Sequence, residues 1–189
     1  MRKIIVSSLM SLDGVIEDPG GMAGVSFGGW ANRFFAGEGA QRSLDRLLAS
    51  EYFLCGRRTY EMFATAWPNA SGPYADRLNA MPKLVASSTL TEPLGWNATL
   101  LNGDAVAELR KIKESGGGDI VMYGSVGLMH SLLGNGLVDQ LDLMVCPVVV
   151  GTGQRMFADG TGFELELIGH TELATGLVVL SYHPEPNGS

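Results

Sequence analysis

The sequence predicts an α/β fold in which a mostly parallel sheet is completed by antiparallel strands. Short apolar runs without charges alternate with helical patterns as far as Gly136, and several of these runs end in glycine or serine turns. Beyond Gly136 the helical patterns disappear and β-branched stretches follow one another. Alternating strands and helices are typical of a parallel sheet, whereas consecutive strands pair antiparallel. With 189 residues, the chain is long enough for one domain with a real core, which we expect over residues 1-184 with a frayed tail at 185-189.

Five strands are expected before Gly136, over residues 2–9, 52–55, 83–86, 98–101 and 120–123. Most are short apolar runs, as expected for strands that are buried on both faces of a parallel sheet. Leucines recur at helical spacing over residues 41–50, and residues 105–114 form an amphipathic pattern that Asp104 can cap. These segments supply helices between the strands.

Later strands are expected over residues 138–150, 163–168 and 177–182. Pro147 lies inside the first of them and predicts a bulge or a break, because proline cannot donate to a strand ladder. A glycine-rich loop over residues 18–29 shows little periodicity. Long loops of this kind are often lids or binding loops.

The turn Gly124-Ser125-Val126-Gly127 separates the strand at 120–123 from a helical pattern that begins near Leu128. A strand, a tight glycine turn and a helix leave free backbone N–H groups at the helix N-terminus, which attract anions, above all phosphates. The turn lacks the full G-x-G-x-x-G pattern, and no P-loop lysine follows it. An ordinary turn without a ligand therefore stays open as the alternative.

Three more polar groups follow predicted strands: Asp13-Gly14, the segment from Gly56 to Thr59 with Arg57 and Arg58, and Ser87-Ser88. Ligands of open parallel sheets bind at the carboxyl ends of strands. The arginines stand where an NAD site usually carries an acid, so a dinucleotide with a 2′-phosphate fits this set of groups. Taken singly, each group has a plain alternative, since the arginines suit a solvated helix start, and the serines and Asp13 suit simple turns.

Composition narrows the classes of partner. A net charge of −7 argues against nucleic acid as a main partner, although a local basic patch can still bind an anion. The two cysteines lie in apolar runs and the three histidines are scattered, which favours reduced thiols in the cytoplasm and no metal site. No run is long enough to span a bilayer and no targeting segment is visible, so no membrane partner is expected.

Five segments of the chain carry a resemblance to a known family: residues 4–16, 54–61, 119–127, 137–141 and 147–153. Together they resemble the dihydrofolate reductase-like superfamily, most closely the reductase domain of bifunctional riboflavin biosynthesis deaminase-reductase proteins and its stand-alone relatives. The resemblance covers nearly the whole chain in order. It implies a central sheet of about eight strands, NADPH as the hydride donor and, frequently, a homodimer.

The resemblance also implies roles for individual residues. The cofactor phosphates, with the 2′-phosphate beside the two serines, are expected at Gly56, Arg57, Arg58, Thr59, Ser87, Ser88, Gly124, Ser125, Val126, Gly127 and Leu128. Asp13 and Gly14 resemble the start of the loop over the nicotinamide. We expect Asp13, Trp30 and Pro147 to border the substrate, with Asp13 as the catalytic candidate that orients substrate or relays a proton. Core packing is the alternative for Trp30.

Two departures from the pattern limit the function. Dihydrofolate reductases carry an acid at the start of the first helix, whereas residues 30–35 contain none and the next acid is Glu38. Folate reduction is therefore not expected, and no counterpart of the zinc-binding deaminase half is expected either. The sequence predicts an NADPH-dependent reductase of a small heterocyclic or carbonyl compound, similar to 5-amino-6-(5-phosphoribosylamino)uracil reductase. Pterins, pyrimidines and carbonyls remain open as substrates, and a nucleotide- or flavin-binding module without turnover is the alternative.

A homodimer is expected to form through the late strands, at Val138 to Val150 and Phe163 to Ile168. This part of the chain is very apolar and has no helices to cover it. Exposed apolar patches usually mark interfaces.

Overall fold

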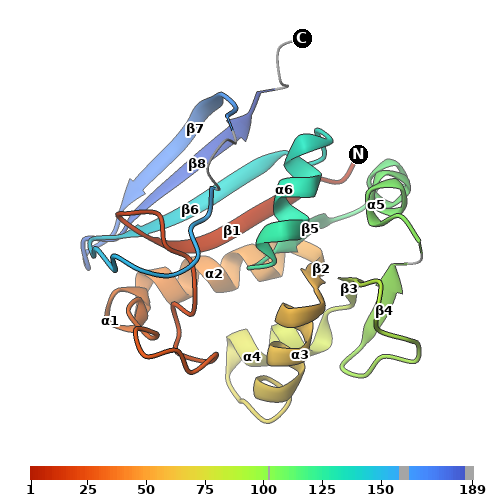
Figure 1. The fold of residues 1–189 in the computed structure, drawn as a ribbon, viewed down its shortest axis with the longest axis horizontal. Helices are drawn as coiled ribbons and strands as arrows, with labels where there is room; N and C mark the ends of the chain where they lie inside the picture. Colours follow the sequence, from red (N-terminus) through yellow and green to blue (C-terminus); the bar gives the residue numbers. More distant parts are fainter. Residues whose placement is uncertain (102, 158–161, 186–189) are drawn as a thin grey trace. The chain divides into compact units, whose positions relative to one another are not determined.

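The computed structural model describes residues 1–101, 103–157 and 162–185, and its strands form an eight-stranded sheet flanked by helices (Figure 1). The strand order is β4-β3-β2-β5-β1-β6-β8-β7. The chain divides into two compact units, the first with residues 1–6 and 43–139 and the second with residues 7–42 and 140–189. Strand β1, Ile4–Ser11, begins in the first unit and ends in the second. The predicted fold class is confirmed.

All strand pairs within the first unit are parallel in the part of the chain that the structure describes. Its complete strands are β2 (Ser50–Gly56), β3 (Lys83–Ala86), β4 (Ala98–Leu101) and β5 (Asp119–Met122). Leu54 pairs with Leu84 on one side and with Met122 on the other, while Ile4 of β1 pairs with Ile120. The carboxyl ends of these strands therefore meet at one edge, as the sequence predicts.

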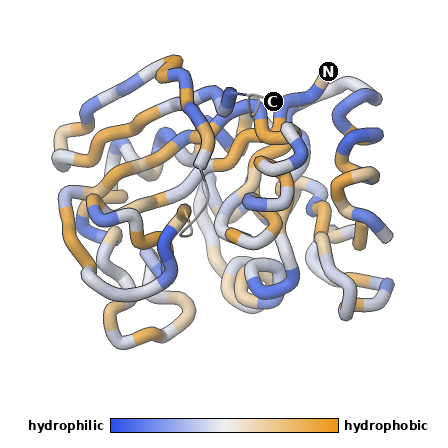
Figure 2. The backbone as a smooth tube through the Cα atoms, turned by 45° about the horizontal axis from the view of Figure 1, so that its top comes forward, coloured by the Kyte–Doolittle hydropathy of each residue, from blue (hydrophilic) through white to orange (hydrophobic). Residues whose placement is uncertain are grey.

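Helices follow most of these strands. They are α2 (Glu38–Ala49), which crosses from the second unit into the first, α3 (Arg57–Ala66), α4 (Pro73–Ala80), α5 (Ala105–Glu114) and α6 (Val126–Gly134). The predicted cap of α5 is confirmed, because the Asp104 side chain accepts the Val106 N–H at 2.9 Å. Figure 2 shows hydrophobic and hydrophilic residues alternating along α5, at the right of the view. No described helix is long and apolar enough to cross a membrane.

An aromatic core lies against strand β2 in the first unit. Phe53 is fully buried and stacks on Phe63 of α3, with 5.7 Å between the ring centroids. The rings of Trp96 and Tyr123 also contact Phe53, at 6.4 Å and 5.6 Å. Aromatic pairs at these separations contribute beyond their burial, so this cluster is a main source of stability for the unit.

The late strands of the second unit pair antiparallel with one another, as predicted. Strand β8 (Val178–Pro184) pairs with β6 (Gln140–Cys146) on one side and with β7 (Leu165–Glu172) on the other. Strand β6 ends before Pro147, which confirms the break predicted there within residues 138–150, because proline has no N–H for the ladder. The short helix α1 (Asn32–Phe35) buries Phe34 in an apolar cluster with Cys146 and Leu177.

The predicted tail at 185–189 is described only at its first residue. The Glu185 N–H donates to the Glu164 carbonyl at 3.0 Å, and residues 186–189 lie outside the described residues. That residues 1-184 form a single domain also stays a prediction.

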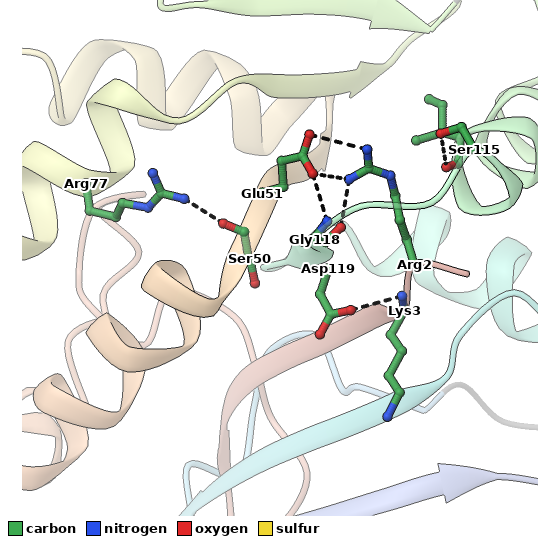
Figure 3. Close-up of polar contacts among 9 residues, drawn as sticks. Arg2, Lys3, Ser50, Glu51, Arg77, Ser115, Gly118 and Asp119 are labelled. Carbon is green, nitrogen blue, oxygen red and sulfur yellow. Dashed lines mark hydrogen bonds and ion pairs between the residues drawn. The ribbon is translucent and has the colours of Figure 1, made fainter.

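Arg2, just before β1, binds Glu51 of β2 and Gly118, the residue before β5 (Figure 3). Its guanidinium pairs with the Glu51 carboxylate and donates to the Gly118 carbonyl at 2.8 Å. Glu51 in turn accepts the Gly118 N–H at 2.8 Å. The side chain of Arg2 is 8% exposed, so these bonds are made largely out of water.

We expect Arg2→Met to lower the free energy of unfolding by about 1–3 kcal/mol, because it leaves the Gly118 carbonyl and the Glu51 carboxylate without a charged donor. The partly exposed Glu51 keeps the loss below that of a fully buried pair. Urea unfolding measures the change. Lys3→Met is the control: this exposed neighbour bonds Asp119 through its backbone N–H, so less than about 0.5 kcal/mol should be lost. Equal losses in both variants would contradict the role of the guanidinium.

Candidate functional site

Helix α3 begins with two arginines at the carboxyl end of β2. Gly56 ends the strand in an extended conformation, no side chain caps the helix, and its first turn holds no acid. Arg57 and Arg58 are exposed, and they make no hydrogen bond or ion pair with any residue that the structure describes. Positive side chains beside the positive end of a helix dipole are unfavourable by themselves. The arrangement is therefore suited to an anion.

Helix α6 begins in a similar way after β5. Its N-cap residue Ser125 has left-handed backbone angles, with φ 55° and ψ 48°, and makes no side-chain cap. Such angles are uncommon for a residue other than glycine and gather at functional sites. At Gly124, φ is 59° and a Cβ would lie 3.1 Å from Thr59 Oγ1, whereas a Cβ at Gly127 would meet nothing within 4 Å. The turn is therefore closely packed against Thr59 at Gly124 and has open space at Gly127.

The Ser125 hydroxyl joins the starts of the two helices. Its oxygen accepts the Gly56 N–H at 2.8 Å, and its proton is directed to Thr59 Oγ1 at 2.9 Å. Thr59 is buried in the first turn of α3. Sequence reasoning placed all of these residues at the site, but it did not find this bridge, which depends on the parallel packing of β2 and β5.

Ser87 and Ser88 follow β3 at the same edge, because Ala86 pairs with Gly56. The Ser87 hydroxyl oxygen accepts the N–H groups of Thr89 and Leu90, each at 3.1 Å, and so shapes the turn. Ser88 is exposed. The first unit thus brings together the candidate residues after three strands.

Asp13 lies in the second unit, just after β1, and both of its carboxylate oxygens accept hydrogen bonds. The donors are the Ser11 hydroxyl at 2.6 Å and the N–H groups of Val150 and Gly151 at 3.0 and 2.9 Å. These bonds lower the pKa of Asp13 to about 2, and the bond from Ser11 has the largest effect. Arg155 also donates to the Asp13 carbonyl. The carboxylate therefore fastens the chain after β1 to the turn after β6.

Glu17 forms a second fastening in the same unit. Its carboxylate accepts the Gln154 N–H at 2.8 Å, and its carbonyl accepts the Trp30 indole N–H at 3.0 Å. Trp30 packs on the apolar cluster around Phe34, so it is partly core, while Pro147 is exposed. Glu17 was assigned no role from the sequence. No local pattern pairs it with Gln154.

The glycine-rich loop predicted over 18–29 is organised by Asp18. Its carboxylate accepts the Ala23 N–H at 2.8 Å, and its carbonyl accepts the N–H groups of Gly21 and Gly29 at 3.1 and 2.9 Å. Asp18 takes a positive φ of 46° to do so. Among the described residues, no three His, Cys, Asp or Glu side chains are grouped so that they could hold a metal ion.

The family of the chain follows from comparison with known proteins. The family model described as "RibD C-terminal domain" matches residues 2–179. The chain belongs to the RibD C-terminal domain family. The resemblance to riboflavin biosynthesis reductase domains in the sequence is thereby confirmed.

One curated protein and two solved structures are similar to nearly the whole chain. The Bacillus subtilis (strain 168) protein YyaP, itself named as uncharacterized, is 27% identical over 188 residues, which cover 96% of this chain and 95% of that protein. The structure of a putative riboflavin biosynthesis protein from Shewanella sp. PV-4 has a TM-score of 0.71 and 22% identity, covering 97% of this chain and 99% of that one.

A bifunctional enzyme from Thermotoga maritima, named diaminohydroxyphosphoribosylaminopyrimidine deaminase/5-amino-6-(5-phosphoribosylamino)uracil reductase, has the same fold with a TM-score of 0.64 and 12% identity. The match covers 97% of this chain and 56% of the Thermotoga maritima chain. At these identities the two solved structures establish the fold that this RibD C-terminal domain shares with them.

We expect Asp13→Asn to speed amide hydrogen exchange at Val150 and Gly151, because an amide offers one acceptor oxygen where the carboxylate offers two. In the unchanged protein, the lowered pKa of Asp13 sets the pH range over which the Val150 and Gly151 amides are protected. Protection at these amides should be complete above about pH 4, the ordinary value for aspartate, and should be lost as the pH falls through about 2. Glu166→Gln, an exposed change on β7, is the control. Unchanged exchange in the Asp13 variant would contradict the fastening.

Proposed function

We propose that this protein is an NADPH-dependent reductase of a small heterocyclic or carbonyl compound. The observation that carries the proposal is the pair Arg57 and Arg58 at the start of α3, which have no hydrogen-bond or ion-pair partner among the described residues and no acid in the first turn of their helix. Membership of the RibD C-terminal domain family supports a riboflavin-biosynthesis-like reductase. The Thermotoga maritima protein with the same fold is named as a reductase of a pyrimidine compound.

The residues at the starts of α3 and α6 fit a phosphorylated dinucleotide. Free N–H groups at both helix starts suit a pyrophosphate, and the open side of Gly127 allows its close approach. An arginine fork matches the donors that a 2′-phosphate requires. The Ser125 hydroxyl, bonded to Gly56 and Thr59, holds the two helix starts in one arrangement.

The bound cofactor supplies the hydride, and the chain supplies binding and orientation. Asp13 is proposed to border the substrate and to orient it. Of the two roles predicted for it, orientation is favoured over proton relay, because a carboxyl group with a pKa of about 2 is ionised at neutral pH. Trp30 and Pro147 are the other proposed substrate neighbours in this unit.

Oxidation of NADPH in the presence of pterins, pyrimidines and aldehydes tests the proposal directly. A reductase consumes NADPH with at least one of these classes, and the consumption follows the added substrate. Binding of NADPH or of a flavin without consumption across the whole panel would instead favour the alternative of a binding module. Absence of binding would contradict both.

We also propose a cytoplasmic homodimer. The two cysteines are buried free thiols, as in a reducing compartment. Of the late strands predicted to form the interface, β6 buries Leu141 and Leu143. Strand β7 ends the sheet and exposes Leu167 and Ile168 by 51% and 50%. An edge strand with exposed apolar side chains can pair with a second copy.

Light scattering at micromolar concentration should report a dimer, and Ile168→Glu should shift it to a monomer, because a charge would be buried at the interface. Glu166→Gln on the same strand is the control and should leave the dimer intact. A monomer in the unchanged protein would overturn this proposal without affecting the proposed chemistry.

A further inference from the structure

Lys83 is a fully buried lysine at the start of β3. Its ammonium donates to the Asn79 carbonyl at 2.8 Å and lies 4.2 Å from the centroid of the Trp96 ring. No carboxylate pairs with it in the described part of the chain. The other buried lysine, Lys113, is different, because it pairs with Asp139 and donates to the Leu137 carbonyl.

A buried ammonium without a carboxylate destabilises the fold that contains it. Burial lowers the pKa of Lys83 to about 8, and the Cys55 thiol on the neighbouring strand opposes that shift only in part. An uncharged side chain of the same length would fill the position at a smaller cost. The presence of a lysine at this buried position is therefore not explained by a contribution to stability.

The group that Lys83 holds is Trp96, near the end of the loop over residues 87–97. The Trp96 indole N–H donates to the Asn79 side chain at 2.7 Å, so Asn79 receives both Trp96 and the ammonium. Trp96 and Asn97 both have positive φ, 57° and 52°. Residues other than glycine keep such angles only where their surroundings impose them. The Lys83–Asn79–Trp96 contacts provide those surroundings.

The same loop connects to the proposed cofactor residues at two points. It starts at Ser87-Ser88, which follow β3 beside Gly56. Near its other end, the Gly95 carbonyl accepts the hydroxyl of Tyr60, which lies in α3 after the two arginines, at 3.2 Å. The position of Trp96 therefore bears on how the serines lie relative to the start of α3.

We propose that Lys83 is a positioning residue for the cofactor: its buried ammonium fixes Trp96, and thereby the loop over 87–97 that presents Ser87 and Ser88 to the 2′-phosphate. The inference rests on the proposed NADPH function. It explains why an unpaired charge stands in the core, since the loop gains a fixed conformation from contacts that cost the fold stability. Lys83 itself is proposed to touch no part of the cofactor.

Lys83→Met separates this role from a purely structural one. We expect the variant to melt about 2–8 °C higher, because an unpaired buried charge is removed. We expect NADPH affinity to fall about 5- to 10-fold, with NADH affinity nearly unchanged. A structural lysine would instead lower stability, and it would not change the ratio of the two affinities.

Lys113→Met is the matched control, because it removes a buried lysine that does have a carboxylate partner. It should melt lower than the unchanged protein and bind both cofactors as before. Trp96→Phe tests the same contacts from the other side, should Lys83→Met fail to fold. It keeps a ring over the ammonium but loses the bond to Asn79, and NADPH affinity should again fall selectively.

Hydrogen exchange of residues 94–97 gives a readout without any cofactor, and it should be faster in both Lys83→Met and Trp96→Phe. Exchange that stays as slow as in the unchanged protein would overturn the inference. If the unchanged protein binds NADPH and both variants keep its ratio of NADPH to NADH affinity, the inference alone fails. If the unchanged protein does not bind NADPH, the proposed function and this inference fail together.

Discussion

Replacing Arg57 or Arg58 with alanine is expected to weaken NADPH binding by about 10- to 100-fold and to leave NADH binding nearly unchanged. The 2′-phosphate is the only group that differs between the two cofactors. A hydrogen bond to a charged group contributes about 1.5–3 kcal/mol, and about 1.4 kcal/mol corresponds to tenfold in affinity. The two arginines need not contribute equally, because one can face the pyrophosphate and the other the 2′-phosphate.

The two variants should fold as well as the unchanged protein. Both side chains are exposed and stand at the positive end of α3, so their removal relieves up to about 1 kcal/mol of unfavourable dipole interaction. Separate titrations of each variant with both cofactors give the result. Arg110→Ala, an exposed arginine on α5, is the control. If neither variant loses NADPH selectively, the pair is only a solvated helix start.

Phe53→Ala is expected to lower the free energy of unfolding by about 3–5 kcal/mol, the largest loss of stability that we predict. Phe53 is fully buried, and its ring contacts Phe63, Trp96 and Tyr123. The substitution removes the buried ring and leaves a cavity that the strand on either side prevents from closing.

Chemical unfolding measures the loss, and Phe35→Ala is the control because that ring is only partly buried in the second unit. The control should lose clearly less stability. A loss below about 1 kcal/mol for Phe53→Ala would show that the aromatic cluster does not hold the first unit together.

The sequence predicts most of the fold because its strands are short apolar runs bounded by turn residues. Helix α4 was missed: Gly72 and Pro73 mark its start, but Ala75 and Leu78 are its only buried residues, too few for a helical pattern. The end of strand β6 at Cys146 could be predicted from Pro147, although the apolar run continues past that residue.

For the candidate site too, the sequence predicts some features and misses others. The glycine turns at Gly56 and Gly124 could be predicted, because a strand, a glycine and a helix follow one another locally. The partners of Asp13 could not, since Val150 lies 137 residues away in the chain. Lys83 was read only as the first residue of a strand, and nothing in its neighbours Leu84 and Val85 indicates that its ammonium is buried over Trp96.

Titration of the unchanged protein with NADPH and with NADH, at one pH and one salt concentration, tests the central claim most directly. We expect NADPH to bind at least about tenfold more tightly than NADH, a difference of about 1.4 kcal/mol that comes from the start of α3. Equal affinities, or no binding of either cofactor, would contradict it.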